Sequence, residues 1–146
     1  MTVVIHMPDG GELRVEASQE TPETGLAELI RSVEEGVEKS SVDTLAESLG
    51  LSKGDVLDLL EIDSSTFSRR RQRLNRHESE RVLRLHRLVG EGLKAFDGDK
   101  DALKRWFQAP NILLGNMPPL QAARFDFGAR EVEKLLARIR TGDFIA

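Results

Sequence analysis

A chain of 146 residues, 39% hydrophobic and 32% charged, is long enough for one domain or two very small ones and can bury a core. The absence of cysteine excludes a disulfide scaffold, a thiolate nucleophile and a cysteine-based zinc site, and no apolar run approaches the ~18 residues of a membrane span. The net charge of −4 is unevenly distributed, because residues 1–64 carry 4 basic and 15 acidic side chains whereas residues 65–87 carry 8 arginines and 2 glutamates. No basic and then apolar leader opens the chain, so we expect a cytoplasmic protein that has no membrane partner.

Residues 1–20 are predicted to form a short N-terminal β-hairpin. Apolar residues alternate with other residues at Val3 and Ile5 and again at Leu13 and Val15, and residues 8–11 read Pro-Asp-Gly-Gly, which favours a turn. Beyond Val15 the spacing of apolar residues is helical, so the predicted fold class is mainly α.

Residues 21–98 are predicted to form a helical domain with a helix-turn-helix at its core. Capping residues followed by helical apolar spacing predict helices that begin near Thr21, Ser40, Ser52, Asp63 and Asn75. Gly50 is expected to end the second of these helices. The fourth is expected to carry Phe67 and Leu74 on one face and the arginine run on the other.

The helix-turn-helix candidate spans residues 53–74. Val56 and Leu60 would hold its first helix, Ile62 the turn, and Phe67 its second helix. This leaves short hydroxyls, which allow a close approach to phosphates, and arginines, which bind phosphates and guanine edges, free to face a DNA major groove: Ser64, Ser65, Thr66, Ser68, Arg69, Arg70 and Arg73. Glu61 occupies a turn position that is commonly glycine, where a left-handed conformation costs roughly 1 kcal/mol. A solvated arginine-rich helix face is the alternative interpretation.

Residues 99–146 are predicted to form a small C-terminal helical domain after a break at residues 97–99. A short helix through Leu103 and Phe107 precedes a loop, residues 110–119, and a last helix with apolar residues at i, i+3, i+4 and i+7 from Val132. Trp106, the only tryptophan, is expected to be largely buried and to anchor this block on the preceding long helix.

Three features of this C-terminal block are candidates for a partner surface. The loop is rich in apolar residues, which either pack beneath the last helix or meet a partner, because exposed apolar patches are costly. The last helix has a basic stripe at a spacing of four residues, which is either a solvated face, with Glu131 pairing with Lys134, or a docking stripe. The tail contains two large apolar residues just before its last residue. The candidate partner-binding residues are Asn111, Leu114, Arg130, Lys134, Arg138, Phe144 and Ile145.

The sequence lacks the residue clusters that catalysis or metal binding requires. The three histidines are scattered, and His77 and His86 are nine residues apart, a spacing that does not place them on one helix face at metal-ligand distance. No nucleophile elbow and no glycine-rich phosphate loop is present. We therefore expect no catalytic residues, no metal site and no cofactor, and we interpret His86 as a partly buried helix residue.

The chain resembles the Xre/MbcA/ParS-type antitoxins over about residues 42–144. The resemblance rests on four stretches: LSKGDVLDLLEIDSSTFSRRR, HESERVLRLHRL, WFQAPNILLGNMPPL and FGAREVEKLLARIRTGDF. It implies an Xre-type DNA-binding domain, a C-terminal toxin-binding domain, and a partner toxin with a RES domain that destroys NAD. Two positions depart from the family pattern: Glu61 lies in the turn, and Phe125 stands where the family tends to have a capping threonine.

These observations predict an antitoxin that neutralises its RES-domain toxin by direct binding and, as a homodimer on operator DNA, represses its own operon. The alternative is a stand-alone helix-turn-helix repressor whose C-terminal block only dimerises it. A small hydrolase or transferase is the third class, and the absence of a clustered His or acidic pair argues against it.

Overall fold

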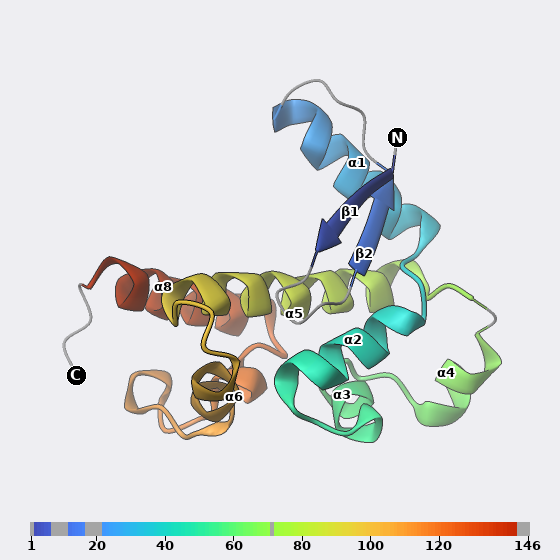
Figure 1. Ribbon diagram of the computed structural model, residues 1–146. Coiled ribbons are helices and arrows are strands. Elements are labelled where there is room, and N and C mark those ends of the chain that lie inside the picture. Colours follow the sequence, from blue (N-terminus) through green and yellow to red (C-terminus); the bar gives the residue numbers. More distant parts are fainter. Residues whose placement is uncertain (1, 7–11, 17–21, 71, 143–146) are drawn as a thin grey trace.

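The structure, a computed structural model, describes residues 2–6, 12–16, 22–70 and 72–142. The long helix α5 (Arg76–Ala95) crosses the molecule, and the other elements lie around it (Figure 1). The helices that precede it are α1 (Pro22–Glu35), α2 (Ser40–Leu49), α3 (Lys53–Leu59) and α4 (Ser64–Arg69). The helices that follow it are α6 (Lys100–Gln108), the short 3-10 turn η1 (Ile112–Leu114), α7 (Pro119–Ala122) and α8 (Asp126–Thr141). The predicted mainly helical fold class is confirmed.

Two short N-terminal strands lie against the helices. Strand β1 (Thr2–His6) pairs antiparallel with β2 (Glu12–Glu16), and Val4 stands opposite Arg14. The turn expected at residues 8–11 lies outside the described residues, so the hairpin as a whole stays a prediction. In the part of the chain that the structure describes, no helix is long and apolar enough to cross a membrane.

Local capping chemistry sets most helix ends. Ser52 accepts a hydrogen bond from the Asp55 N–H at the start of α3, and Asn75 forms a reciprocal capping box with Glu78 at the start of α5, both as predicted. Gly50 ends α2 in a left-handed conformation with φ of 66°. The predicted cap of α2 is wrong, because Ser40 is its first helical residue and no side chain caps this helix.

The core is aliphatic and continuous from α2 to α8. Its fully buried members are mostly leucine and valine, and the largest of them is Phe107, with 1% exposed. Trp106 is partly buried and packs against this core rather than within it. The helical turn of α6 directs Leu103 and Phe107 into the core. Trp106 therefore lies at the core's edge, with its ring 6.0 Å from the Phe96 ring.

Helix α8 runs alongside the C-terminal half of α5 in the same direction (Figure 1). Nη2 of Arg84, near the middle of α5, lies 3.8 Å from Oδ1 of Asp126 at the start of α8. Oε2 of Glu91, also on α5, lies 3.5 Å from Nη1 of Arg140 near the end of α8. The predicted apolar stripe of α8 that begins at Val132 packs on this side, and this packing attaches the C-terminal block to the rest of the molecule.

Candidate functional site

Helices α3 and α4 form the predicted helix-turn-helix at one end of the molecule (Figure 1). Val56 and Leu60 are 0% exposed, and Ile62 and Phe67 are 4% exposed. The predicted packing of both helices and of the turn between them is therefore confirmed.

Glu61 takes a left-handed conformation in this turn, with φ of 56°. Its carboxylate Oε1 lies 3.7 Å from Nη2 of Arg124, which follows α7, so the ion pair joins the turn to the C-terminal block. Both side chains are more than 40% exposed, and such a pair contributes about 0–1 kcal/mol. Backbone strain at Glu61 is therefore expected to outweigh the ion pair.

Replacing Glu61 with glycine is expected to raise the free energy of unfolding by about 0.5–1 kcal/mol, because glycine adopts the left-handed conformation without a Cβ clash. Urea unfolding followed by circular dichroism measures this change. Glu61→Ala is the matched control, since it removes the ion pair but keeps the Cβ atom, and it should give no gain. A less stable glycine variant would show that the ion pair contributes more than the strain costs.

The start of α4 is capped by Asp63. Its carboxylate accepts a hydrogen bond from the Ser65 hydroxyl and one from the Thr66 N–H at 3.4 Å. The Ser65 hydroxyl first, and the Thr66 N–H second, hold the pKa of Asp63 below its usual value. The Thr66 N–H is therefore already bonded to a carboxylate and is not free for a phosphate.

Four of the predicted DNA-binding residues are exposed and form the outer face of α4: Ser64, Ser65, Ser68 and Arg69. A fifth, Thr66, is half-buried. The Ser68 hydroxyl donates to the Ser64 carbonyl at 2.9 Å, and Nε of Arg69 donates to the Ser65 carbonyl at 3.3 Å. These bonds lay the side chains along the helix and leave a small hydroxyl-rich surface beside one guanidinium.

Helix α4 is shorter than predicted. It ends at Arg69, so the expectation of one helix from residue 64 through Leu74 is wrong. The Lys39 N–H donates to the Gln72 carbonyl at 2.9 Å, and the Leu74 N–H donates to the Val37 carbonyl at 2.8 Å. This pairing with the loop before α2 draws residues 72–74 into an extended segment, because it satisfies their backbone groups outside a helix.

Arg70 directly follows α4 and Arg73 lies in the extended segment, and both side chains contact other parts of the protein. Nε of Arg70 lies 3.2 Å from Oε1 of Glu78, and Nη1 of Arg73 donates to the Gly36 carbonyl at 2.9 Å. Of the three arginines predicted to bind DNA, only Arg69 lies on α4 itself.

The loop between α6 and α7 is rigidly built and presents apolar side chains to solvent. Oδ1 of Asn111 accepts from the Leu113 N–H at 3.0 Å, and the Asn111 N–H donates to the Met117 carbonyl at 3.2 Å. Ile112 is 80% exposed and Leu113 is 52% exposed, whereas Leu114 packs partly against the core. Of the predicted loop residues, Asn111 therefore shapes the loop and Leu114 turns inward. Ile112 and Leu113 belong to the apolar loop that the sequence indicated as a candidate partner surface, but they were not among the residues predicted to bind a partner.

The basic stripe of α8 is exposed along its length. Arg130 pairs with Asp126 at 2.7 Å, and Lys134 pairs with Glu131 at 3.1 Å, which confirms the predicted Glu131–Lys134 pair. Arg138 is also exposed. Two of the three stripe cations are thus partly neutralised by their own helix.

Two exposed aromatic rings at the start of α8 were not predicted. Phe125 is 50% and Phe127 is 71% exposed, and their rings stack with centroids 5.5 Å apart. Phe125 occupies the N-cap position, where it supplies no hydrogen bond. The tail residues predicted to bind a partner, Phe144 and Ile145, lie outside the described residues.

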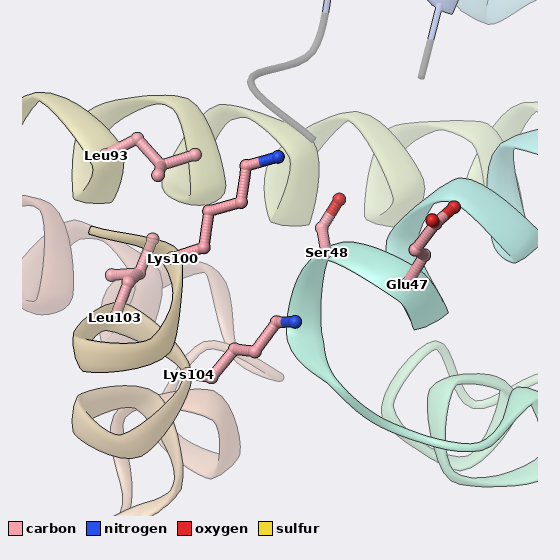
Figure 2. A pocket seen from close by; sticks show the side chains of 6 residues that line it. All are labelled: Glu47, Ser48, Leu93, Lys100, Leu103 and Lys104. Carbon is pink, nitrogen blue, oxygen red and sulfur yellow. The ribbon is translucent and has the colours of Figure 1, made fainter. Parts of the chain in front are cut away.

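Within the described ranges, no group of three or more His, Cys, Asp or Glu could hold a metal ion. His86 is buried on α5, with Nε2 3.3 Å from the Ser41 carbonyl, in line with its prediction as a helix residue. A cavity of about 110 Å³ lies between α2 and α6, where Lys100 and Lys104 extend toward Ser48 (Figure 2). Its volume is below the ~300–1,000 Å³ of typical ligand pockets, so we assign no ligand to it.

The buried turn between α3 and α4 and the serine-rich outer face of α4 define a helix-turn-helix protein, to which a helical block with an exposed apolar loop is appended. Residues 28–87 match the family model for the antitoxin Xre-like helix-turn-helix domain. Residues 93–142 match that for the antitoxin Xre/MbcA/ParS C-terminal toxin-binding domain. The chain belongs to the Xre antitoxin family, and it is the antitoxin of a toxin–antitoxin system.

Relatives of known name agree with this assignment. "Antitoxin Xre" of Photorhabdus laumondii is 31% identical over 111 residues, which are 74% of this chain and 75% of that protein. "Antitoxin Xre" of Yersinia enterocolitica is 29% identical over 119 residues, or 80% of each chain. The "Prs ADP-ribosylating antitoxin" of Sphingobium sp. is 28% identical over 123 residues, or 77% of each chain.

A solved structure shares the fold. A chain from the crystal structure of the M. tuberculosis MbcT–MbcA toxin–antitoxin complex matches with a TM-score of 0.56 at 22% identity, over 73% of this chain and 96% of that chain. At this level of identity the match shows a common fold.

Proposed function

We propose that this antitoxin neutralises an NAD-degrading toxin of the RES type by direct binding through residues 99–146. The exposed loop carries the proposal, because Ile112 and Leu113 project from a backbone that Asn111 already holds in place. Burying such an aliphatic side chain at an interface yields about 1.5–3 kcal/mol. A preorganised loop gives up little entropy on binding, so most of this free energy remains as affinity.

The other parts of this surface are the basic stripe and the tail. Arg138 would pair with toxin carboxylates, as would Arg130 and Lys134 once released from their helix partners. Phe144 and Ile145 would block the toxin's substrate cleft. The RES type and the loss of NAD rest on the family resemblance given above.

Co-purification tests this proposal. Expressing the native operon with a tag on the antitoxin should yield a stoichiometric complex with an enzyme that consumes NAD, and the complex should be inactive. Recovery of the antitoxin without any enzyme, in cells whose NAD level does not respond to its removal, would contradict it.

We also propose a division of labour along the chain, with residues 21–98 binding operator DNA and repressing the operon and residues 1–20 forming an N-terminal hairpin. The outer face of α4 would meet the DNA, with Arg69 as its charged contact. Arg70 and Arg73 lie beside this face, where their charges would attract phosphates. The ion pair of Arg70 with Glu78 and the hydrogen bond from Arg73 to the Gly36 carbonyl would hold the segment in place.

Replacing Arg69 with alanine is expected to weaken operator binding at least tenfold and to reduce the slope of log K against log salt by about 0.9 for each phosphate that the protein no longer neutralises. Fluorescence anisotropy over a salt series measures both quantities. Arg130→Ala, which removes the same charge from an exposed site on α8, is the matched control and should leave the slope unchanged. Equal slopes in the Arg69 variant and the wild type would contradict this assignment.

A homodimer is the expected DNA-binding unit, and α1 offers a surface for it. Leu26, Leu29 and Ile30 lie three and four residues apart on this helix and are 40–62% exposed. A two-fold interface uses the same patch of both copies, which suits one apolar helix face. Replacing Leu26 and Ile30 with lysine should convert a dimer into a monomer in sedimentation velocity; a dimer that survives both changes would exclude this face.

A further inference from the structure

A groove of about 350 Å³ lies between α3 on one side and the end of α6 with α7 on the other. Apolar side chains line much of it: Leu51, Leu59, Phe107, Pro118 and Leu120. Asp55 and Asp58 line the same groove, three residues apart on α3. Residues at this spacing lie on the same face of a helix, so both carboxylates stand above one apolar floor. The volume is at the lower end of the range of ligand pockets.

The cations on adjoining segments are already paired. Nζ of Lys53 lies 3.5 Å from Oδ1 of Asp43. Arg124 also lines the groove, and its Nη2 lies 3.7 Å from Oε1 of Glu61. Among the described residues, neither Asp55 nor Asp58 has a cation within ion-pair distance. The groove thus combines uncovered apolar area with two carboxylates that have no ion-pair partner among the described residues.

The chemistry of this groove excludes a nucleic acid as its occupant, because two carboxylates repel phosphates. It suits an arginine, whose aliphatic stem can lie on Leu59 and Leu120 while its guanidinium meets Asp55 and Asp58.

We propose that the partner toxin inserts an arginine-bearing segment into this groove, so that its footprint extends from the C-terminal block onto α3. This inference rests on the proposed function and deepens it, since residues 93–142 match the toxin-binding domain and Asp55 and Asp58 lie outside them. Arg124 and Gln121 on α7's side of the groove connect the two parts of the footprint. The first helix of the helix-turn-helix thereby becomes part of the toxin interface.

The test uses the full chain and the toxin of the same operon in a catalytically inactive form. The double variant Asp55→Asn with Asp58→Asn should bind the toxin about tenfold or more weakly, and with a smaller salt dependence, because the variant cannot form the charge pair at the interface. Gln121→Trp, which fills the groove without changing charge, should weaken binding as well. Hydrogen exchange should show that residues 53–60 become protected when the toxin binds.

The matched control is Glu34→Gln with Glu35→Gln, which removes two negative charges from exposed positions on α1, outside both the groove and the C-terminal block. If this control loses as much toxin affinity as the groove variant, the loss comes from the change in net charge alone, and the proposal is overturned. Unchanged affinity in both groove variants would overturn it too. If the groove variants change the oligomeric state of the free antitoxin but not its affinity for the toxin, the groove binds a second copy of the chain instead. Failure of the wild-type chain to bind the toxin at all would refute the proposed function itself, which is a distinguishable result.

Discussion

Replacing Ile112 and Leu113 with aspartate should weaken toxin binding about 100-fold or more. Both side chains project from the loop, and burying a charge in their place costs several kcal/mol beyond the apolar burial that the variant forgoes. Biolayer interferometry with inactive toxin measures the affinity. Operator binding and the melting temperature should not change, because neither residue contributes to the core.

A conservative pair controls for the loop itself. Ile112→Val with Leu113→Met keeps the surface apolar and should keep affinity within a few fold. If the aspartate pair binds as well as the wild type, this loop does not touch the toxin. A truncation after Arg140 tests the tail separately, and full protection of cells by that truncation would exclude the tail from neutralisation.

Replacing Phe107 with alanine should lower the free energy of unfolding by about 3–5 kcal/mol, because the ring is fully buried in the core and its removal leaves a cavity. Phe127→Ala makes the same chemical change at a site that is 71% exposed and should cost no more than about 0.5 kcal/mol. Urea unfolding gives both values. If Phe107→Ala lowers the free energy of unfolding only slightly, the C-terminal block is not part of one cooperative core.

Features that depend on neighbouring residues could be predicted from the sequence. Ser52, Asn75 and Gly50 set helix ends through local hydrogen bonds or a left-handed backbone, and each acts within three or four residues. The left-handed turn at Glu61 follows from the same local logic.

Features that depend on distant parts of the chain could not be predicted in this way. Helix α4 ends at Arg69 because the chain after it pairs with residues 37–39, more than thirty positions away. The same pairing gives Arg73 a partner, the Gly36 carbonyl, that the local pattern does not reveal. The side of α6 that faces the core is fixed by α2, α5 and α7, which is why Phe107 is fully buried and Trp106 only partly.

The candidate partner surface was predicted in outline, and the projecting residues were not. Apolar composition located the loop at residues 110–119, but only its backbone hydrogen bonds decide that Leu114 turns inward and Ile112 outward. The groove beneath Asp55 and Asp58 involves three separate segments of chain, so no single stretch of sequence indicates it.

Inhibition of the purified toxin by the purified antitoxin tests the central claim most directly. The rate of NAD consumption should fall to zero as antitoxin is added, with a sharp end point at a fixed molar ratio, and the Ile112→Asp, Leu113→Asp variant should need a large excess to do the same. A rate that does not change at any antitoxin concentration, from a chain that still binds operator DNA, would contradict direct neutralisation. That result would leave a stand-alone repressor whose C-terminal block only dimerises it.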